Sequence, residues 1–318
     1  MSSIGFGLLS SVFGIGVRSR NALYDRGLFR GRRLRAPVVS VGNLSVGGSG
    51  KTPFVILLGE LLKARGIECD ILSRGYGRQS AGVAIVDPQG AAREFGDEPL
   101  LMARRLGVPV VVGEDRYQAG LLAEKKFGPQ LHILDDGFQH RALARDFDIV
   151  LVTPEDVNDR LLPRGRMREP TSSLRRADAV VLSGATPESF PLDGKRVWQV
   201  SRGILPTDIP PRPVAFCGIA RPGNFFRELR MTRVEPVAEA SYRDHHAYTE
   251  RDVQELLELC SSREGGGYVT TEKDAINLGP HLAKLTPLAV VAVSMRLVDA
   301  PNAVDTLLRV VGEREHTA

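Results

Sequence analysis

A glycine-rich stretch followed by lysine and threonine has the residue types of a phosphate-binding loop. The run Gly47-Gly48-Ser49-Gly50-Lys51-Thr52 follows a short apolar segment and precedes Pro53. Glycines let backbone N–H groups approach an anion closely, a lysine ammonium reaches the outer phosphates, and a threonine hydroxyl can ligate Mg²⁺. The usual pattern G-x-x-x-x-G-K-[ST] is broken only at its first position, where Ser45 replaces glycine. The spacing predicts a nucleoside triphosphate site.

Two carboxylates follow an apolar run further along the chain. Asp135 and Asp136 come directly after residues 131–134. A phosphate-loop protein needs a carboxylate at the end of a neighbouring strand to hold Mg²⁺, usually through water. We therefore expect Asp135 or Asp136 to anchor the metal together with Thr52, and the sequence leaves open which of the two makes the direct contact.

Residues suited to proton transfer lie far apart in the sequence. Asp97 stands in a Gly-Asp-Glu-Pro turn, where it could be a helix cap or a general base. His245 and His246 are adjacent, and histidine is the side chain best suited to moving protons near pH 7. Paired histidines are also common in surface loops.

Two further segments carry mixed charges. Residues 162–170 concentrate three arginines, Arg164, Arg166 and Arg168, which could form a solvated basic loop or a clamp on phosphoryl oxygens. The segment Glu272-Lys273-Asp274 follows an apolar run and could be a surface turn or a contact to the nucleotide.

Apolar runs of strand length alternate with helical patterns over most of the chain, which predicts a parallel sheet covered on both faces. Prolines concentrate in residues 203–213, which we interpret as a linker. We therefore expect a phosphate-loop domain of the α/β class over residues 36–205 and a smaller α/β domain over residues 206–318.

Residues 1–35 differ in charge from the remainder. They hold seven arginines and one acid, a net charge of +6, whereas the rest of the chain has 35 basic and 37 acidic side chains. The basic character is therefore local, and a general affinity for nucleic acid is not indicated. The arginines follow the apolar run 4–17, which is too short to span a bilayer. This pattern suits a segment lying on an anionic membrane surface, and the alternative is an ordinary packed helix. The three scattered cysteines favour a reducing compartment.

Taken together, these segments resemble those of the tetraacyldisaccharide 4′-kinase family, the lipid A 4′-kinases. The resemblance spans nearly the whole chain, and its segments occur in the right order. The matching segments are residues 43–53, 72–77, 96–99, 135–140 (Asp-Asp-Gly-Phe-Gln-His), 164–170, 244–246 and 271–274. The string at 135–140 is the most specific of them.

The resemblance implies a membrane-associated kinase with two α/β domains and a site in the cleft between them. It would move the γ-phosphate of ATP to the 4′-hydroxyl of a tetraacyldisaccharide 1-phosphate, a lipid A precursor, at the cytoplasmic face of the inner membrane. Attachment would be peripheral or monotopic, through the N-terminal segment. By match of motif, Asp97 would be the catalytic aspartate and the histidine pair would contain its partner, with His245 the favoured one.

The resemblance also assigns roles around the phosphates. Arg168 would be the transition-state arginine, and Glu169 would join Asp135 and Asp136 as metal-handling acids. Glu272-Lys273-Asp274 would lie near the nucleotide base. Two rival functions remain from the residues alone: a kinase or synthetase for a soluble metabolite, which would need no membrane dock, and a membrane-bound nucleotide switch, which would not need the histidine pair.

Overall fold

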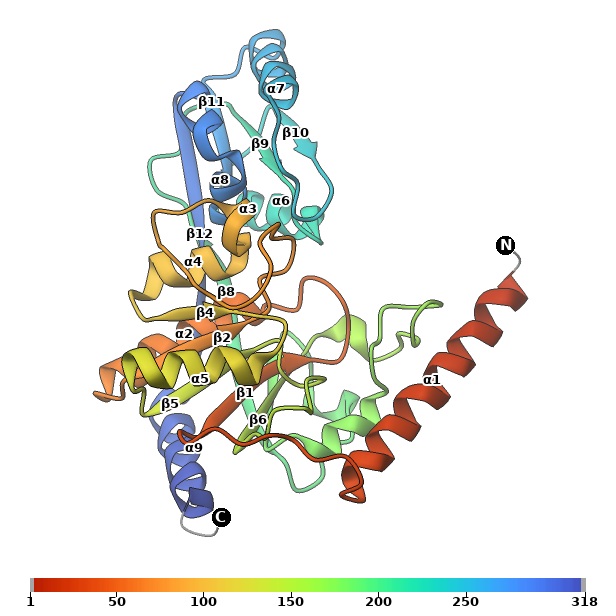
Figure 1. The fold of residues 1–318 in the computed structure, drawn as a ribbon. Helices are drawn as coiled ribbons and strands as arrows, with labels where there is room; N and C mark the ends of the chain where they lie inside the picture. Colours follow the sequence, from red (N-terminus) through yellow and green to blue (C-terminus); the bar gives the residue numbers. More distant parts are fainter. Residues whose placement is uncertain (1–2, 316–318) are drawn as a thin grey trace.

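The computed structural model describes residues 3–315, so residues 1–2 and 316–318, the extremes of the expected N- and C-terminal regions, lie outside it. Two lobes lie one above the other in Figure 1. In the described part of the chain, a 12-stranded sheet runs through both lobes in the order β10-β9-β11-β12-β8-β7-β6-β1-β5-β2-β4-β3.

Parallel strands form the centre of the lower lobe. They are β1 (Val38–Asn43), β2 (Cys69–Ser73), β4 (Val110–Val112), β5 (Leu131–Asp135), β6 (Phe147–Val152) and β7 (Ala179–Ser183). Nearly every residue of these strands is buried, as expected for short apolar runs in a parallel sheet covered on both faces. The predicted α/β class with a phosphate-loop type of sheet is confirmed.

Helices cover this sheet. They are α2 (Lys51–Ala64), α4 (Asp97–Leu106), α5 (Arg116–Phe127) and α9 (Ala300–Glu315), with the short α3 (Ala92–Phe95) beside the edge strand β3 (Ala84–Ile85). Helix α9 lies beyond the expected boundary at 205/206, yet it packs on the lower lobe. Its Leu307 and Val311 share a core cluster with Leu62 of α2. The division into domains stays a prediction.

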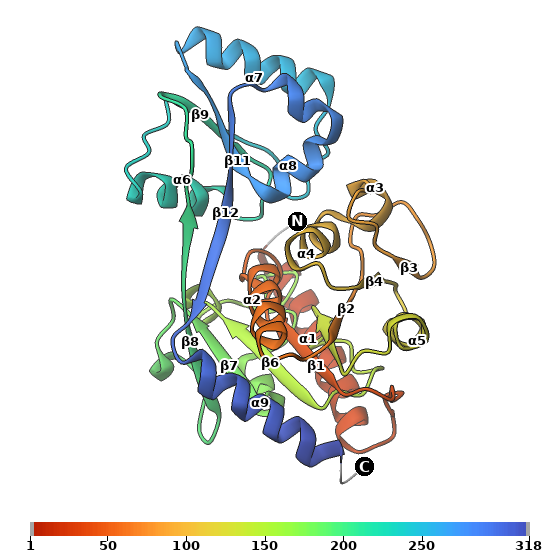
Figure 2. The ribbon, with the colours of Figure 1, turned by 90° about the vertical axis from the view of Figure 1, so that its left-hand side faces the viewer.

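Strands β8 (Arg196–Leu205) and β12 (Leu288–Leu297) pair in antiparallel fashion and run between the lobes (Figure 2). Strand β8 continues through residues 203–205 of the expected linker. It does so because the two strands supply each other's backbone hydrogen bonds along their length, with Ser201 opposite Arg296 and Leu205 opposite Ala292.

The upper lobe is a smaller α/β unit. Its strands are β9 (Pro213–Cys217), β10 (Ala238–Ser241) and β11 (Gly267–Thr271), and its helices are α6 (Pro222–Met231), α7 (Glu250–Ser262) and α8 (Glu272–Leu278). A capping pair begins α7: the Thr249 hydroxyl accepts from the backbone N–H of Asp252, whose carboxylate accepts from the N–H of Thr249.

Helix α1 (Ser3–Asp25) extends away from the lower lobe (Figure 1). The side chains of Leu9, Val12 and Ile15 stand on one face of it and are 46%, 60% and 61% exposed. None of the helices within residues 3–315 combines the length and apolar character required to cross a bilayer.

Candidate active site

The phosphate loop joins β1 to the N-terminus of α2. Gly50, the residue before α2, has φ +86°, a left-handed conformation that favours glycine. Gly48 has φ +44°, which also favours glycine, and a Cβ there would stand 3.0 Å from the Arg221 side chain of the upper lobe. Lys51 and Thr52 begin α2, where free N–H groups and the helix dipole favour an anion.

Asn43, at the end of β1, organises the side chains around this loop. It is fully buried, and the Nδ2–H of its side-chain amide donates to Ser49 Oγ at 2.8 Å. The side-chain oxygen Oδ1 accepts from Lys51 Nζ at 3.1 Å and also from the Arg168 guanidinium. One neutral oxygen thus holds two cations side by side, ready for a phosphate. Asn43 was not among the predicted site residues, although its position at the end of a strand directly before the loop could have indicated a role at the phosphate site.

The carboxylate of Asp136 lies beside both of these cations. Its carboxylate accepts from Arg168 at 2.7 and 2.8 Å and lies 3.6 Å from Lys51 Nζ. Burial disfavours its charged form, but Lys51 and Arg168 outweigh burial and hold the pKa of Asp136 well below its usual range. Asp136 is therefore ionised at neutral pH.

Asp135, at the end of β5, has the opposite character. Burial, together with the charges of Glu98 and Asp136, raises the pKa of Asp135 to about 7. Ser73 donates to its Oδ2 at 2.8 Å, while its buried Oδ1 has no hydrogen-bond partner among the described residues. An unpaired carboxylate oxygen in the cleft that Thr52 also lines fits a hard cation such as Mg²⁺. Within residues 3–315 no cluster of three or more His, Cys, Asp and Glu side chains forms a complete metal cage, so other ligands would come from phosphate and water.

Asp97 and His245 meet across the two lobes. His245 Nδ1 lies 2.8 and 2.9 Å from the two oxygens of Asp97, which is only 4% exposed, and Asn277 donates to the same carboxylate at 3.1 Å. Burial disfavours charge on Asp97, but His245 and Lys273 outweigh it and lower the pKa of Asp97 to about 2. The hydrogen bond to Asp97 raises the pKa of His245. Asp97 is thus ionised at neutral pH.

His246 has a different environment. Its ring stacks on Tyr242, with centroids 4.8 Å apart, and its Nε2 lies 3.1 Å from Asp252. The neighbouring histidines therefore point to different places, and it is His245 that contacts Asp97.

The side chains of the segment 272–274 also point to different places. Lys273 Nζ donates to Glu98 at 2.6 Å, and Glu272 pairs with Arg105 at 2.8 Å, so both bridge to α4 of the lower lobe. Asp274 is fully buried inside the upper lobe, where it accepts from the Gly218 N–H and the Tyr248 hydroxyl.

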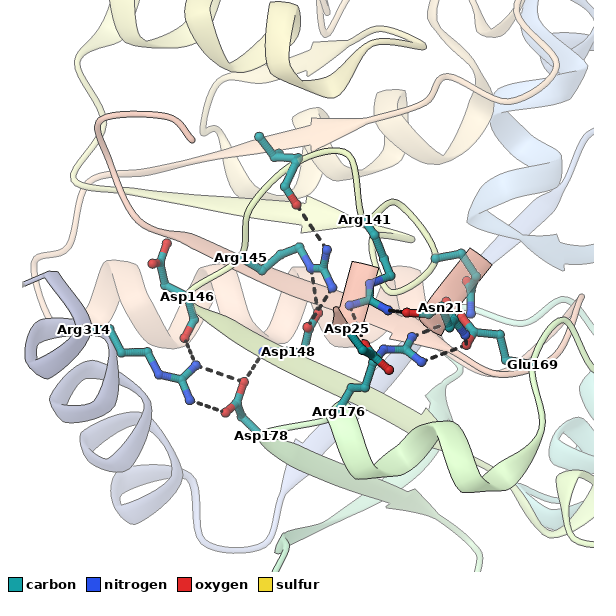
Figure 3. Close-up of polar contacts among 12 residues, drawn as sticks. Asn21, Asp25, Arg141, Arg145, Asp146, Asp148, Glu169, Arg176, Asp178 and Arg314 are labelled. Carbon is teal, nitrogen blue, oxygen red and sulfur yellow. Dashed lines mark hydrogen bonds and ion pairs between the residues drawn. The ribbon is translucent and has the colours of Figure 1, made fainter. Parts of the chain in front are cut away.

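Glu169 also lies away from the phosphates. Arg176 donates to its two oxygens at 2.9 and 3.2 Å, and Asn21 of α1 donates to one of them at 2.7 Å, as Figure 3 shows. The carboxylate is buried and already has these partners, so the structure does not bring Glu169 together with Asp135 and Asp136.

These groups line a cleft of about 560 Å³ between the lobes, a size typical of a site for a nucleotide-sized ligand. The predicted residues that line it are Gly47, Gly48, Ser49, Gly50, Lys51, Thr52, Pro53, Asp97, Asp135, Asp136, Arg168, His245, Glu272 and Lys273. It is also lined by residues that the sequence analysis did not single out, among them Arg74, Tyr76, Glu98, Arg202 and Arg221. Glu98 could have been found as the neighbour of Asp97 in the Gly-Asp-Glu-Pro turn.

Comparisons with known proteins point to one family. A family model described as Tetraacyldisaccharide-1-P 4′-kinase matches residues 4–312. The tetraacyldisaccharide 4′-kinase of Koribacter versatilis is 51% identical over 318 residues, covering 96% of this chain and 99% of the relative. That of Aquifex aeolicus is 43% identical over 280 residues, covering 82% and 85%. The crystal structure of Aquifex aeolicus LpxK in complex with ATP superposes with a TM-score of 0.81 at 37% identity, covering 96% of this chain and 98% of that one.

Proposed function

Because the chain belongs to the tetraacyldisaccharide 4′-kinase family of lipid A biosynthesis, we propose that it transfers the γ-phosphate of ATP to the 4′-hydroxyl of a tetraacyldisaccharide 1-phosphate, giving the 1,4′-bisphosphate. The observation that carries this proposal is the contact of Asp97 with His245 in the cleft that the phosphate loop lines. A proton acceptor facing a phosphate site is what a kinase for a hydroxyl needs.

Asp97 acts as the general base. A sugar hydroxyl is a poor nucleophile at pH 7, so a carboxylate must take its proton as the new P–O bond forms. The ionised state of Asp97 supports this role, and His245 orients the carboxylate. Because base and orienting residue come from different lobes, a change in the lobe arrangement would separate them and limit hydrolysis of ATP by water.

The phosphates of ATP bind to the loop 47–52, with Lys51 and Arg168 facing the transferred group. Asn43 and Asp136 hold these two cations before ATP arrives, so little reorganisation is needed. Thr52, Asp135 and Asp136 would hold a Mg²⁺ ion, which when bound would offset charge on the β- and γ-phosphates. Glu272 and Lys273 line the cleft and would lie near the base of the nucleotide.

Helix α1 brings the enzyme to its acylated substrate. The exposed side chains of Leu9, Val12 and Ile15 would enter the apolar part of the interface, and the exposed Arg18, Arg26 and Arg30 would face anionic headgroups. Arg32 and Arg33 instead pair with Asp115 and Asp146 of the lower lobe. Docking of this kind places the protein at the cytoplasmic face of the inner membrane as a peripheral or monotopic enzyme.

One assay tests the proposal against its rivals. Purified protein is incubated with labelled ATP and the acylated disaccharide 1-phosphate in detergent micelles, and lipids are separated by thin-layer chromatography. Label should appear in the lipid and should be lost in Lys51→Ala. Transfer only to soluble sugars or nucleosides would instead favour a metabolite kinase, and slow release of phosphate with no acceptor would favour a nucleotide switch.

A further inference from the structure

Glu169 is a buried carboxylate without a place in the mechanism described above. It is 2% exposed, its hydrogen bonds go to Arg176 and Asn21, and it does not line the cleft (Figure 3). A metal ion would have to displace Arg176, whose guanidinium donates to both oxygens at once, an arrangement with strict geometry. The donor set of Glu169 therefore does not fit a metal ligand.

The neighbouring residue is Arg168, which faces the phosphates. The backbone N–H groups of Arg168 and Glu169 both point at the carbonyl oxygen of Leu44, at 2.6 and 3.3 Å, which ties this segment to the start of the phosphate loop. From this shared attachment the two side chains reach different partners. Arg168 binds Asp136 and Asn43, and Glu169 binds Arg176 and Asn21.

The partners of Glu169 connect it to two other parts of the site. Arg176 stacks over the ring of Phe138 at 4.3 Å, and Phe138 lies two residues after Asp136. Asn21 belongs to α1 and is itself buried, so its hydrogen bond to Glu169 exists only while α1 is seated on the lower lobe. A movement of α1 would therefore displace Glu169, and through Glu169 the adjacent Arg168.

We propose that Glu169 is a positioning residue that holds Arg168 in place, and that the Asn21–Glu169 hydrogen bond couples the seating of α1 to this position. The inference rests on the proposed roles of Arg168 and α1. Through this coupling, the enzyme is most active when its membrane-docking helix is correctly seated. The reason is that a misplacement of about 1 Å at a catalytic group can cost roughly 100-fold in rate.

The test compares Glu169→Gln, Asn21→Ala and the double variant by kcat, by the KM for ATP and by the Mg²⁺ concentration that gives half-maximal rate. Glu169→Gln keeps the size of the side chain and should lower kcat roughly 10- to 100-fold, and Asn21→Ala should lower it roughly 3- to 10-fold, with the Mg²⁺ dependence unchanged in both. Since the two residues act through one contact, the double variant should be little worse than Glu169→Gln alone.

Ser11→Ala is the matched control. Ser11 also belongs to α1, but its exposed hydroxyl donates to the Gly7 carbonyl oxygen of the same helix at 3.1 Å, so its removal leaves the seating of α1 and the contacts of Glu169 intact. This variant should keep kcat within about twofold of the wild type. Urea unfolding of each variant ensures that rates are compared on folded protein. If Glu169→Gln does not fold, Asn21→Ala carries the test, because it leaves the Glu169–Arg176 pair intact.

Several results would overturn the inference. A rise in the half-maximal Mg²⁺ concentration of tenfold or more in Glu169→Gln, with kcat restored by excess Mg²⁺, would make Glu169 a metal ligand. A loss of stability with unchanged kcat in both single variants would make the network purely structural. Failure of the proposed function is distinct from both, because the wild-type protein would then fail to label the lipid.

Discussion

Replacing Asp97 by Asn removes the proposed proton acceptor while keeping the size of the side chain. Because general base catalysis contributes about 10²- to 10⁴-fold, kcat should fall by that factor, with a much smaller change in the KM for ATP. If Asp97 served only to cap α4, its replacement by Asn would be nearly neutral, since Asn caps a helix about as well as Asp.

The same substitution has a predictable effect on stability. The folded-state pKa of Asp97 is about 2 against 3.8 for an ordinary aspartate, and each unit of difference in pKa corresponds to about 1.4 kcal/mol, so ionised Asp97 stabilises the fold by about 2 kcal/mol. The pKa is lowered in the folded state, so this stabilisation is present above about pH 4 and is lost as the pH falls toward 2. Asp97→Asn should therefore unfold at lower urea at pH 7, and the difference from the wild type should shrink below pH 4.

Asp70→Asn is the matched control for this prediction. Asp70 is also fully buried and contacts a histidine, His132 Nδ1, at 2.7 Å. That pair lies toward the opposite end of the parallel strands from Asp135, so its loss should destabilise the fold without lowering kcat. The assays are lipid phosphorylation and urea unfolding between pH 3 and 8. Near-wild-type kcat in Asp97→Asn, or equal losses of kcat in the two variants, would refute the reasoning.

Three further outcomes are expected. Lys51→Ala and Thr52→Ala should each remove most lipid kinase activity and leave the unfolding transition nearly unchanged, because their side chains act on phosphate and metal; normal turnover in Lys51→Ala would remove the kinase assignment. His245→Ala should lower kcat as Asp97→Asn does, and the double variant should be little worse than the worse single one; fully additive losses would contradict a shared role. Deleting residues 1–17 should shift the protein from membrane to soluble fractions with ATP binding intact, whereas a partition that neither the deletion nor high salt changes would identify α1 as an ordinary packed helix.

Local patterns were sufficient to predict the phosphate site and the class of fold. The loop 47–52 and the acids at 135–136 each follow an apolar run, and a parallel sheet brings such strand ends to one edge. The pairing of Asp97 with His245 could not follow from spacing, because 148 positions separate the two residues. It was implied by the family resemblance, and the geometry of the cleft agrees with it.

Other features depend on tertiary contacts that no local pattern reports. The length of β8 is set by its partner β12. The surroundings of Glu169 are set by Arg176 and by Asn21 of α1, which lies 148 positions earlier in the chain. A motif can therefore identify Glu169 as important without revealing that its carboxylate faces away from the phosphates.

The position of α9 has a consequence for how the protein is made. Val304, Leu307, Val310 and Val311 of this helix belong to the same core cluster as Leu62 of α2 and the strands of the lower lobe. Burying an apolar side chain of this kind contributes roughly 1.5–3 kcal/mol, so the lower lobe lacks a substantial share of its core until residues 300–311 have been synthesised. Although domains generally fold in order from the N-terminus during synthesis, the phosphate-binding lobe must wait for the upper lobe to be translated before it can close. A chain whose synthesis stops within the upper lobe would therefore contain the complete phosphate loop in a lobe that is not stably folded.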